Sequence, residues 1–211
     1  GARETFIHDD QLQVVIRDDG LGAAVELTSY PLSHNFGDSL RRYREHYHGK
    51  IHHQTVSEHQ GEGIASAHDI IRFKHPIDAA DVVPDCLPRA LFLDALDGTP
   101  IDDYRSDGKS GFARAGVTKV YAIAGGQLTV TWTFSGLAGQ SFTTILNLAM
   151  PSCDGFLGRY SLADGSIPSG FGQALVLPET RRLNLEDGVL GGTLELSASC
   201  PVGLAGRPHH T

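Results

Sequence analysis

Apolar and polar residues alternate along much of this chain. The clearest example runs over residues 128–135, where every second residue is apolar and the residues between are threonine or serine. This period of two is typical of a strand with one buried face, and it places Trp132 in the core. The run at 118–123 precedes it, separated by Gly125 and Gly126, which tolerate the positive φ angles of a tight turn. We therefore predict a β-hairpin here.

The rest of the chain repeats this strand pattern in short pieces. Turn pairs such as Asp97-Gly98 and Asp187-Gly188 separate the pieces, and the chain has 25 glycines. Many short strands with such turns predict an all-β fold of antiparallel strands in a single sandwich domain over residues 1–211, with a disordered tail at 201–211. The further strands are expected at residues 11–17, 23–28, 90–93, 141–148, 173–177, 182–185 and 193–197.

One segment, residues 39–48, departs from the strand pattern. Asp38 can cap a helix at its start, and Gly49 can end it. We predict one short helix here, which must pack on a sheet or on another domain because a helix of about ten residues is marginal alone. Its apolar face has the spacing i, i+3, i+7, i+11. The residues of that face are Leu40, Tyr43, Tyr47 and Ile51.

Charge and composition narrow the partners. The chain has 17 basic and 25 acidic residues, a formal charge of −8, which opposes binding to nucleic acid. Three widely spaced cysteines without a CxxC pair favour reduced thiols and a cytoplasmic location. No apolar run reaches the roughly twenty residues of a membrane span, so no membrane partner is expected. The start without methionine suggests a fragment of a longer enzyme.

Histidines and acidic pairs are the candidates for chemistry. His46 and His48 would point about 200° apart on a helix, and the nearby histidines at 52, 53 and 59 lack ligand spacing, so no metal is predicted. The pairs at 9–10, 18–19 and 102–103 stand at turns, where acids are usually turn formers. Nucleophile, phosphate-loop and dinucleotide motifs are absent, so we predict no cofactor and no catalytic residue.

Three aromatic residues in loop-like surroundings offer a different role. Tyr30, Phe36 and Tyr104 are candidates for contact with carbohydrate, although loop aromatics commonly pack locally instead. Both interpretations remain open from the residues alone.

The stretch NFGDSLRRYREHYH at 35–48 resembles a motif in the C-terminal domain of the α-amylase and 4-α-glucanotransferase group of glycoside hydrolase family 57. The motif places a second arginine where this chain has Tyr43. Docking of the helix is the favoured role for the polar residues of this motif, and direct substrate contact is the alternative. The matching residues are Asn35, Asp38, Leu40, Arg42, Glu45, Tyr47 and His48.

A second stretch supports the resemblance. PRALFLD at 88–94 is similar to a family element that ends in aspartate and histidine, and this chain has Ala95 in place of the histidine. The resemblance makes Arg89 and Asp94 further candidates for carbohydrate contact. It implies a galactose-mutarotase-like β-supersandwich that follows a catalytic (β/α)7 barrel and a helical domain. In the family the catalytic carboxylates lie on the barrel.

We therefore expect a non-catalytic accessory domain of an α-glucan-acting enzyme, with the upstream catalytic domain of the same polypeptide as its partner and α-glucan as a candidate ligand. The alternative is a free-standing domain of the aldose-epimerase or carbohydrate-binding type. An epimerase would need an acid and a base such as His68 and Glu58 brought together by folding. A third possibility is an interaction module that binds another subunit through its helix.

Overall fold

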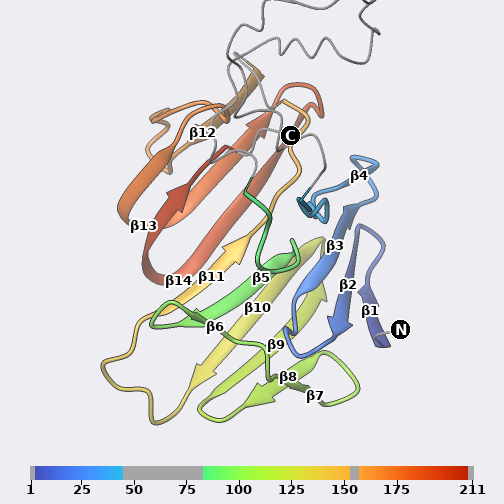
Figure 1. Cartoon of the computed structure of the whole chain (residues 1–211). Coiled ribbons are helices and arrows are strands. Elements are labelled where there is room, and N and C mark those ends of the chain that lie inside the picture. The colour runs from blue at the N-terminus through green and yellow to red at the C-terminus, as the bar shows by residue number, and fades with distance from the viewer. Residues whose placement is uncertain (1–2, 45–82, 153–156, 209–211) are drawn as a thin grey trace, which may run out of the picture. The chain divides into compact units, whose positions relative to one another are not determined.

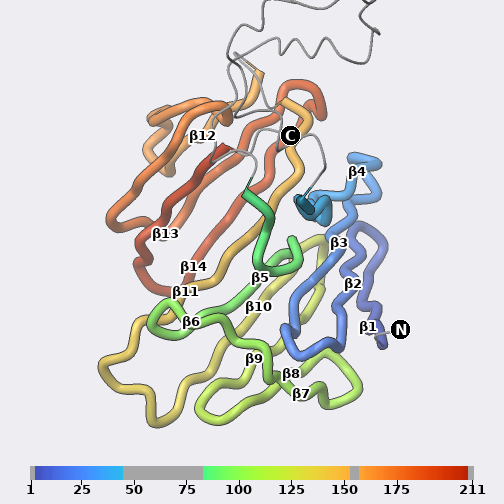
Figure 2. The backbone as a smooth tube through the Cα atoms, viewed as in Figure 1, coloured from blue at the N-terminus to red at the C-terminus, as the bar shows by residue number. Residues whose placement is uncertain are grey.

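The computed structural model describes residues 3–44, 83–152 and 157–208. The chain divides into two compact units, where the sequence predicts one domain: residues 1–39 together with 90–211, and residues 40–89. All of the named strands belong to the first unit, as the ribbon and the tube show (Figures 1 and 2). Within the described ranges no helix is long and apolar enough to cross a membrane.

The strands of the first unit form three sheets, and every pairing is antiparallel (Figure 1). The all-β antiparallel fold is confirmed. The first sheet has the order β1 (Arg3–His8), β2 (Leu12–Asp18), β3 (Ala24–Ser29), β5 (Leu91–Leu96), β11 (Phe142–Leu146), with β4 (His34–Asn35) beside β3 and β6 (Thr99–Pro100) beside β5. The second has the order β10 (Gln127–Phe134), β9 (Val117–Ala124), β8 (Gly111–Arg114), β7 (Arg105–Ser106). The third has the order β12 (Gly158–Ser161), β13 (Leu175–Asp187), β14 (Gly192–Gly206).

The predicted hairpin is β9 and β10. Its two strands pair without a register shift from Ala124 and Gln127 at the turn to Val117 and Phe134 at the far end. Gly125 and Gly126 take φ angles of 60° and 73°, which a residue with a Cβ adopts only with strain. The alternating pattern therefore specifies both strands and the turn between them.

The main core lies between the first and second sheets. Val14, Ile16 and Leu91 contribute from the first sheet, and Phe112 and Tyr121 from the second, each with at most 1% of its surface exposed. Burial of a large apolar side chain stabilises a fold by about 1.5–3 kcal/mol. Side chains from both sheets are needed to close this core.

Two of the three acidic pairs, at 9–10 and 18–19, lie at turns, as predicted, whereas residues 102–103 lie in irregular chain without a turn. One Asp9 carboxylate oxygen accepts from the main-chain N–H groups of Gln11 and Leu12, each at 2.8 Å, and the other accepts from Gly126 N at 2.8 Å. Asp9 thus ties the β1–β2 turn to the turn of the β9–β10 hairpin. These bonds, the one from Gly126 first, lower the pKa of Asp9. Asp19 likewise accepts from Leu21 N at 3.1 Å.

The C-terminal part is more ordered than the sequence suggests. β13 joins two predicted strands into one of 13 residues, with register shifts around Thr180. β14 continues to Gly206, which pairs with Leu175. The predicted disordered tail at 201–211 is therefore wrong for residues 201–206, which belong to β14, because β13 pairs with residues 202 and 204–206. Residues 209–211 lie outside the described ranges.

The predicted helix at 39–48 is wrong where it can be compared, because residues 39–44 have no helical structure. The main chain of Arg42 bonds to a distant residue instead: its N–H donates to the Asp85 carboxylate at 2.7 Å, and its carbonyl accepts from Asp85 N at 3.1 Å. A helix would engage both groups locally, and a helix this short forms at a nucleation cost. Residues 45–48 lie outside the described ranges.

Candidate functional site

The first half of the motif at 35–48 fixes the path of the main chain just before residue 40, where the second unit begins. The Asn35 side-chain oxygen accepts from Leu27 N at 3.0 Å and from Gly37 N at 2.9 Å. Asp38 N donates to the Asn147 carbonyl at 3.0 Å. Asn35 therefore acts on main-chain geometry next to β4, where a polar side chain satisfies donors that strand pairing leaves open.

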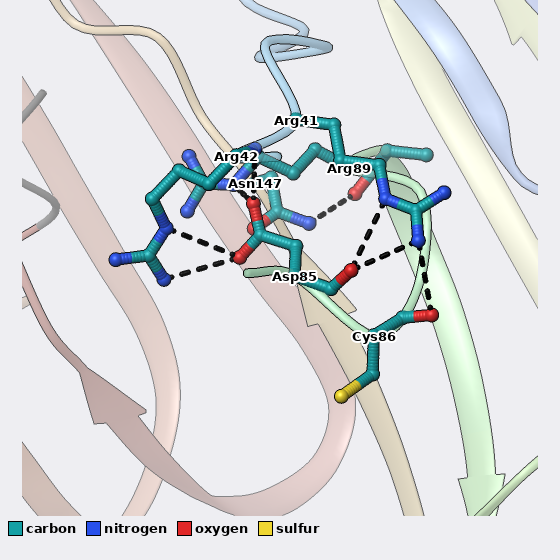
Figure 3. A network of polar contacts seen from close by, with 7 residues as sticks. Arg41, Arg42, Asp85, Cys86, Arg89 and Asn147 are labelled. Carbon is teal, nitrogen blue, oxygen red and sulfur yellow. Dashed lines mark hydrogen bonds and ion pairs between the residues drawn. The ribbon is translucent and has the colours of Figure 1, made fainter. Parts of the chain in front are cut away.

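Among the described residues of the second unit, three arginines gather around one aspartate (Figure 3). We call this cluster the Asp85 clasp, and its members are Arg41, Arg42, Asp85 and Arg89. The Arg42 guanidinium donates to Asp85 Oδ1 through Nη2 at 3.1 Å and through Nε at 3.4 Å. Arg89 Nε lies 3.3 Å from Asp85 Oδ2. The forked geometry of arginine suits such shared contacts with a carboxylate.

The Arg41 side chain binds main-chain carbonyl groups of the segment that contains Asp85. Its guanidinium donates to the Asp85 carbonyl from Nε at 3.1 Å and from Nη2 at 2.9 Å, and to the Cys86 carbonyl at 3.3 Å (Figure 3). It also lies 5.3 Å from the centre of the Tyr43 ring, within the range of a cation–π contact. Residues 40–44 and 83–89 are therefore joined by side-chain and main-chain bonds together.

The electrostatics of the clasp favour an anchor over an acid catalyst. Partial burial would by itself raise the pKa of Asp85, but the hydrogen bonds and charge of Arg42 outweigh it and lower the pKa. Asp85 is then ionised at neutral pH and donates no proton. Arg42 and Asp85 are 43 residues apart, so their bonds close a long stretch of chain, and the entropy cost of such closure grows only slowly with length.

A second polar cluster is enclosed in the first unit. Asp94 and Lys119 form an ion pair of 3.0 Å, and both side chains are 0% exposed. Asp94 Oδ2 also accepts from the Tyr104 hydroxyl at 2.9 Å and from Trp132 Nε1 at 3.0 Å. We call these four residues the Asp94 network. A buried ion pair survives removal from water only when hydrogen bonds of this kind accompany it.

The main chain of β5 is bent toward Lys119. Leu91 and Leu93 pair with consecutive residues of β11, so Phe92 is the extra residue of a β-bulge, and its φ of +62° is rare for a bulky side chain. The Phe92 carbonyl accepts from Lys119 Nζ at 2.5 Å. Burial lowers the pKa of Lys119, and the charge of Asp94 opposes that shift.

The residues predicted to contact carbohydrate differ in accessibility. Tyr30 is 43% exposed, with its hydroxyl 3.2 Å from the Gln13 side-chain oxygen. Phe36, Asp94 and Tyr104 are each 3% exposed, and Arg89 belongs to the Asp85 clasp. The structure brings Asp94 and Tyr104 together in the core, where neither faces solvent. Carbohydrate contact stays a prediction, and Tyr30 is the member of this set with an open side chain.

Two residues of these clusters were missed by sequence reasoning. Lys119 occupies an inward position in the alternation of β9, between buried Val117 and Tyr121, and a charge at such a position is a signal of a buried partner. Asp85 has no comparable local signal. Glu45, Tyr47, His48 and the histidines considered for metal binding lie outside the described ranges. Within those ranges no group of three or more His, Cys, Asp or Glu side chains is arranged to hold a metal.

Comparison of the whole chain with known protein families identifies the family to which it belongs. The family described as "Alpha-amylase/4-alpha-glucanotransferase, C-terminal" matches residues 1–102 and 103–211, which together are the whole chain. The chain belongs to this family. The resemblance seen at residues 35–48 and 88–94 is confirmed at this level: the protein is a C-terminal domain of the α-amylase/4-α-glucanotransferase group.

Two relatives show the extent of the likeness. A 4-α-glucanotransferase of Thermococcus kodakarensis is 31% identical over 107 residues, which are 50% of this chain and 16% of that protein. The crystal structure of the 4-α-glucanotransferase from Thermococcus litoralis matches with a TM-score of 0.62 and 13% identity, over 97% of this chain and 35% of that one. The second likeness shows a shared fold. This C-terminal domain spans a minor part of both proteins.

The Asp85 clasp predicts a local effect of removing one charge. In Asp85→Asn the side chain keeps an acceptor but loses its charge, so we expect the Arg42 main-chain N–H to exchange with solvent about tenfold faster. Amide hydrogen exchange followed by NMR measures this rate. Asp97→Asn, which alters the acceptor of Ser141 N in the first unit, is the control and should leave Arg42 unchanged. Equal exchange in Asp85→Asn and the native domain would contradict the clasp.

The Asp94 network predicts strong coupling between its two charges. Lys119→Met and Asp94→Asn should each lower the free energy of unfolding by about 3–5 kcal/mol, because each leaves one buried charge without its partner. The double variant should lose clearly less than the sum. Urea unfolding of the four proteins, followed by circular dichroism, gives the coupling energy. Additive losses would mean that the two charges do not act as a pair.

The buried tyrosines predict a loss of stability in alkaline solution. Burial, and after it the charge of Asp94, raises the pKa of Tyr104 and of Tyr121 above the ordinary value of 10.0. The folded chain keeps these protons above pH 10 while the unfolded chain releases them, so stability is full below pH 10 and falls above it. Tyr104→Phe should reduce that fall.

Urea unfolding at about pH 9 and about pH 11 measures the effect. The native domain is compared with Tyr104→Phe because Lys119 acts in the opposite direction in both: its lowered pKa makes stability rise with pH until unfolded lysine also loses its proton. An equal loss of stability in both proteins between these two pH values would show that folding does not raise the pKa of Tyr104.

Proposed function

We propose that this chain is a non-catalytic accessory domain of an α-glucan-acting enzyme of the α-amylase/4-α-glucanotransferase type, and that it supports the catalytic domain of the same polypeptide. One observation carries the proposal: the C-terminal family matches the whole chain, while the chain covers only 35% of the 4-α-glucanotransferase structure that it resembles. Most of such an enzyme therefore lies outside the matched region.

The carboxyl groups of the described residues support a non-catalytic role. Glycoside hydrolysis needs one carboxylic acid with a raised pKa that can donate a proton to the leaving group. Where the pKa of a described carboxyl departs clearly from its ordinary value, it is lowered. This holds for Asp9, Asp85, Asp107, Asp164, Glu186 and Asp187.

The Asp85 clasp supports the docking part of the proposal. It ties Arg41 and Arg42 to residues 85–89 and so holds the start of residues 40–89 against their end. The motif continues through Glu45, Tyr47 and His48, which we assign to contact with the catalytic domain.

Carbohydrate contact is the finer part of the proposal. Tyr30 is an exposed aromatic residue whose ring can meet the apolar face of a sugar and whose hydroxyl already lies in a hydrogen bond with Gln13. A single exposed ring gives weak binding, so we expect α-glucan affinity in the millimolar range. We also place the domain in the cytoplasm, on the grounds of its free and widely spaced thiols.

Incubation of the chain with maltoheptaose tests the catalytic part. We expect neither shorter nor longer maltooligosaccharides by chromatography, and their formation would refute a non-catalytic domain.

NMR titration with maltoheptaose tests the contact between Tyr30 and α-glucan. Shifts at Tyr30 and at the residues around it support the contact if those of the neighbouring residues disappear in Tyr30→Ala and persist in Tyr43→Ala. No shift anywhere leaves only the supporting role. Faster mutarotation of glucose in a polarimeter would favour the epimerase alternative.

A further inference from the structure

Strand β10 is an edge of the second sheet, and its outer side has no partner strand among the described residues (Figure 1). The two-residue turn makes Ala124 and Gln127 a hydrogen-bonded pair, and such pairs then alternate along the hairpin. The N–H and C=O groups of residues 128, 130, 132 and 134 consequently point away from β9. No main-chain bond joins these groups to a described residue.

The other edge strands carry features that prevent pairing with another chain. β1 contains Arg3 and Glu4, and β14 contains Pro201. β7 has two residues and β12 has four, while β11 has five and pairs across a bulge. β10 has eight residues with no charge, no proline and no register shift. Unprotected edges of this kind pair readily, and natural proteins usually guard them.

The part of the sheet face next to this edge is also uncharged. On this face Arg105 of β7 lies opposite Ala113, on the far side of the sheet from β10. The exposed side chains of the three nearer strands, β8, β9 and β10, carry no charge: Ala113, Thr118, Val120, Ala122, Ala124, Gln127, Thr129, Thr131 and Thr133. The third sheet differs, because ion pairs cross its strands, Arg159 with Glu186 and Arg182 with Glu195. In a chain of formal charge −8, the β10 edge is thus a region with no charge to oppose close approach.

We propose that β10 pairs with β10 of a second copy of this chain, antiparallel and about a twofold axis at Thr131, so that two four-stranded sheets become one continuous sheet. This register places Leu128 opposite the partner's Phe134 and Val130 opposite the partner's Trp132. All four outward-pointing residues then find hydrogen-bonding partners. On the exposed face Thr129 meets the partner's Thr133, a cross-strand pair that favours association.

A second copy suits this edge because of symmetry. On the twofold axis Thr131 approaches its own copy, so a charge at this position would meet a like charge, and β10 has no charged residue. The contact also extends beyond the strand. An apolar groove of about 410 Å³ lies at the end of β10, lined by Leu96, Phe134, Leu137 and Phe142 among others. The same register brings the partner's Gly125–Gly126 turn beside this groove.

Sedimentation velocity of the 211-residue chain tests the pairing. We expect a dimer whose population rises with concentration and falls in Thr131→Lys, which places two lysines opposite each other at the axis. Thr118→Lys is the matched control: the same charge is added to the same exposed face, one strand away from the edge, and the dimer should persist. Circular dichroism confirms that each variant is folded.

Mixing gives the decisive comparison. Thr131→Lys and Thr131→Glu should each be monomeric alone and should form a mixed dimer together, because opposite charges then meet at the axis. A native chain that stays monomeric from micromolar to millimolar concentration would overturn the proposal and leave the edge to the rest of a longer polypeptide. A dimer that Thr131→Lys leaves intact would overturn it as well, since association would then use another surface.

Discussion

The ion pair between Asp94 and Lys119 connects the two sheets that enclose the main core. Asp94 lies on β5 of the first sheet and Lys119 on β9 of the second, and neither side chain reaches solvent. Tyr104 and Trp132 donate to the same carboxylate oxygen, so residues of the second sheet and of the segment before it meet at one atom of the first. A one-residue slip of β9 would expose Lys119 and bury Thr118, so the pair also specifies the register.

The local geometry of β5 follows from this pair. Lys119 needs acceptors besides Asp94, and the bulge at Phe92 turns a main-chain carbonyl toward it. A positive φ at phenylalanine costs of order 1–3 kcal/mol and persists only where the surroundings demand it. Three aromatic rings, those of Tyr104, Tyr121 and Trp132, lie within 6 Å of the ammonium group and shield it from water. Strain in one strand is therefore offset by bonds between two sheets.

Sequence reasoning succeeded where the signal is local. The alternation at 118–135 predicts β9 and β10 because each residue reports its own face. It failed at residues 39–44, because Asp85 binds the main chain of Arg42 from 43 residues away and local spacing contains no trace of that contact. Tyr104 stands among turn residues, a setting that predicts an accessible side chain. It is buried because Asp94 of β5 and Lys119 of β9 pack against it, and both are distant in the sequence. The strand at 201–206 likewise depends on pairing with β13.

The stretches that carry the family resemblance are engaged in architecture. Asn35 satisfies main-chain donors beside β4, Arg42 binds Asp85, and Asp94 holds the buried lysine. A match to such residues is therefore evidence about how the chain folds, and it would hold for any chemistry performed elsewhere in a longer polypeptide. The same view explains why these polar residues stand out in the sequence. Buried polar groups must be paired, so folding alone is enough to demand them at these positions.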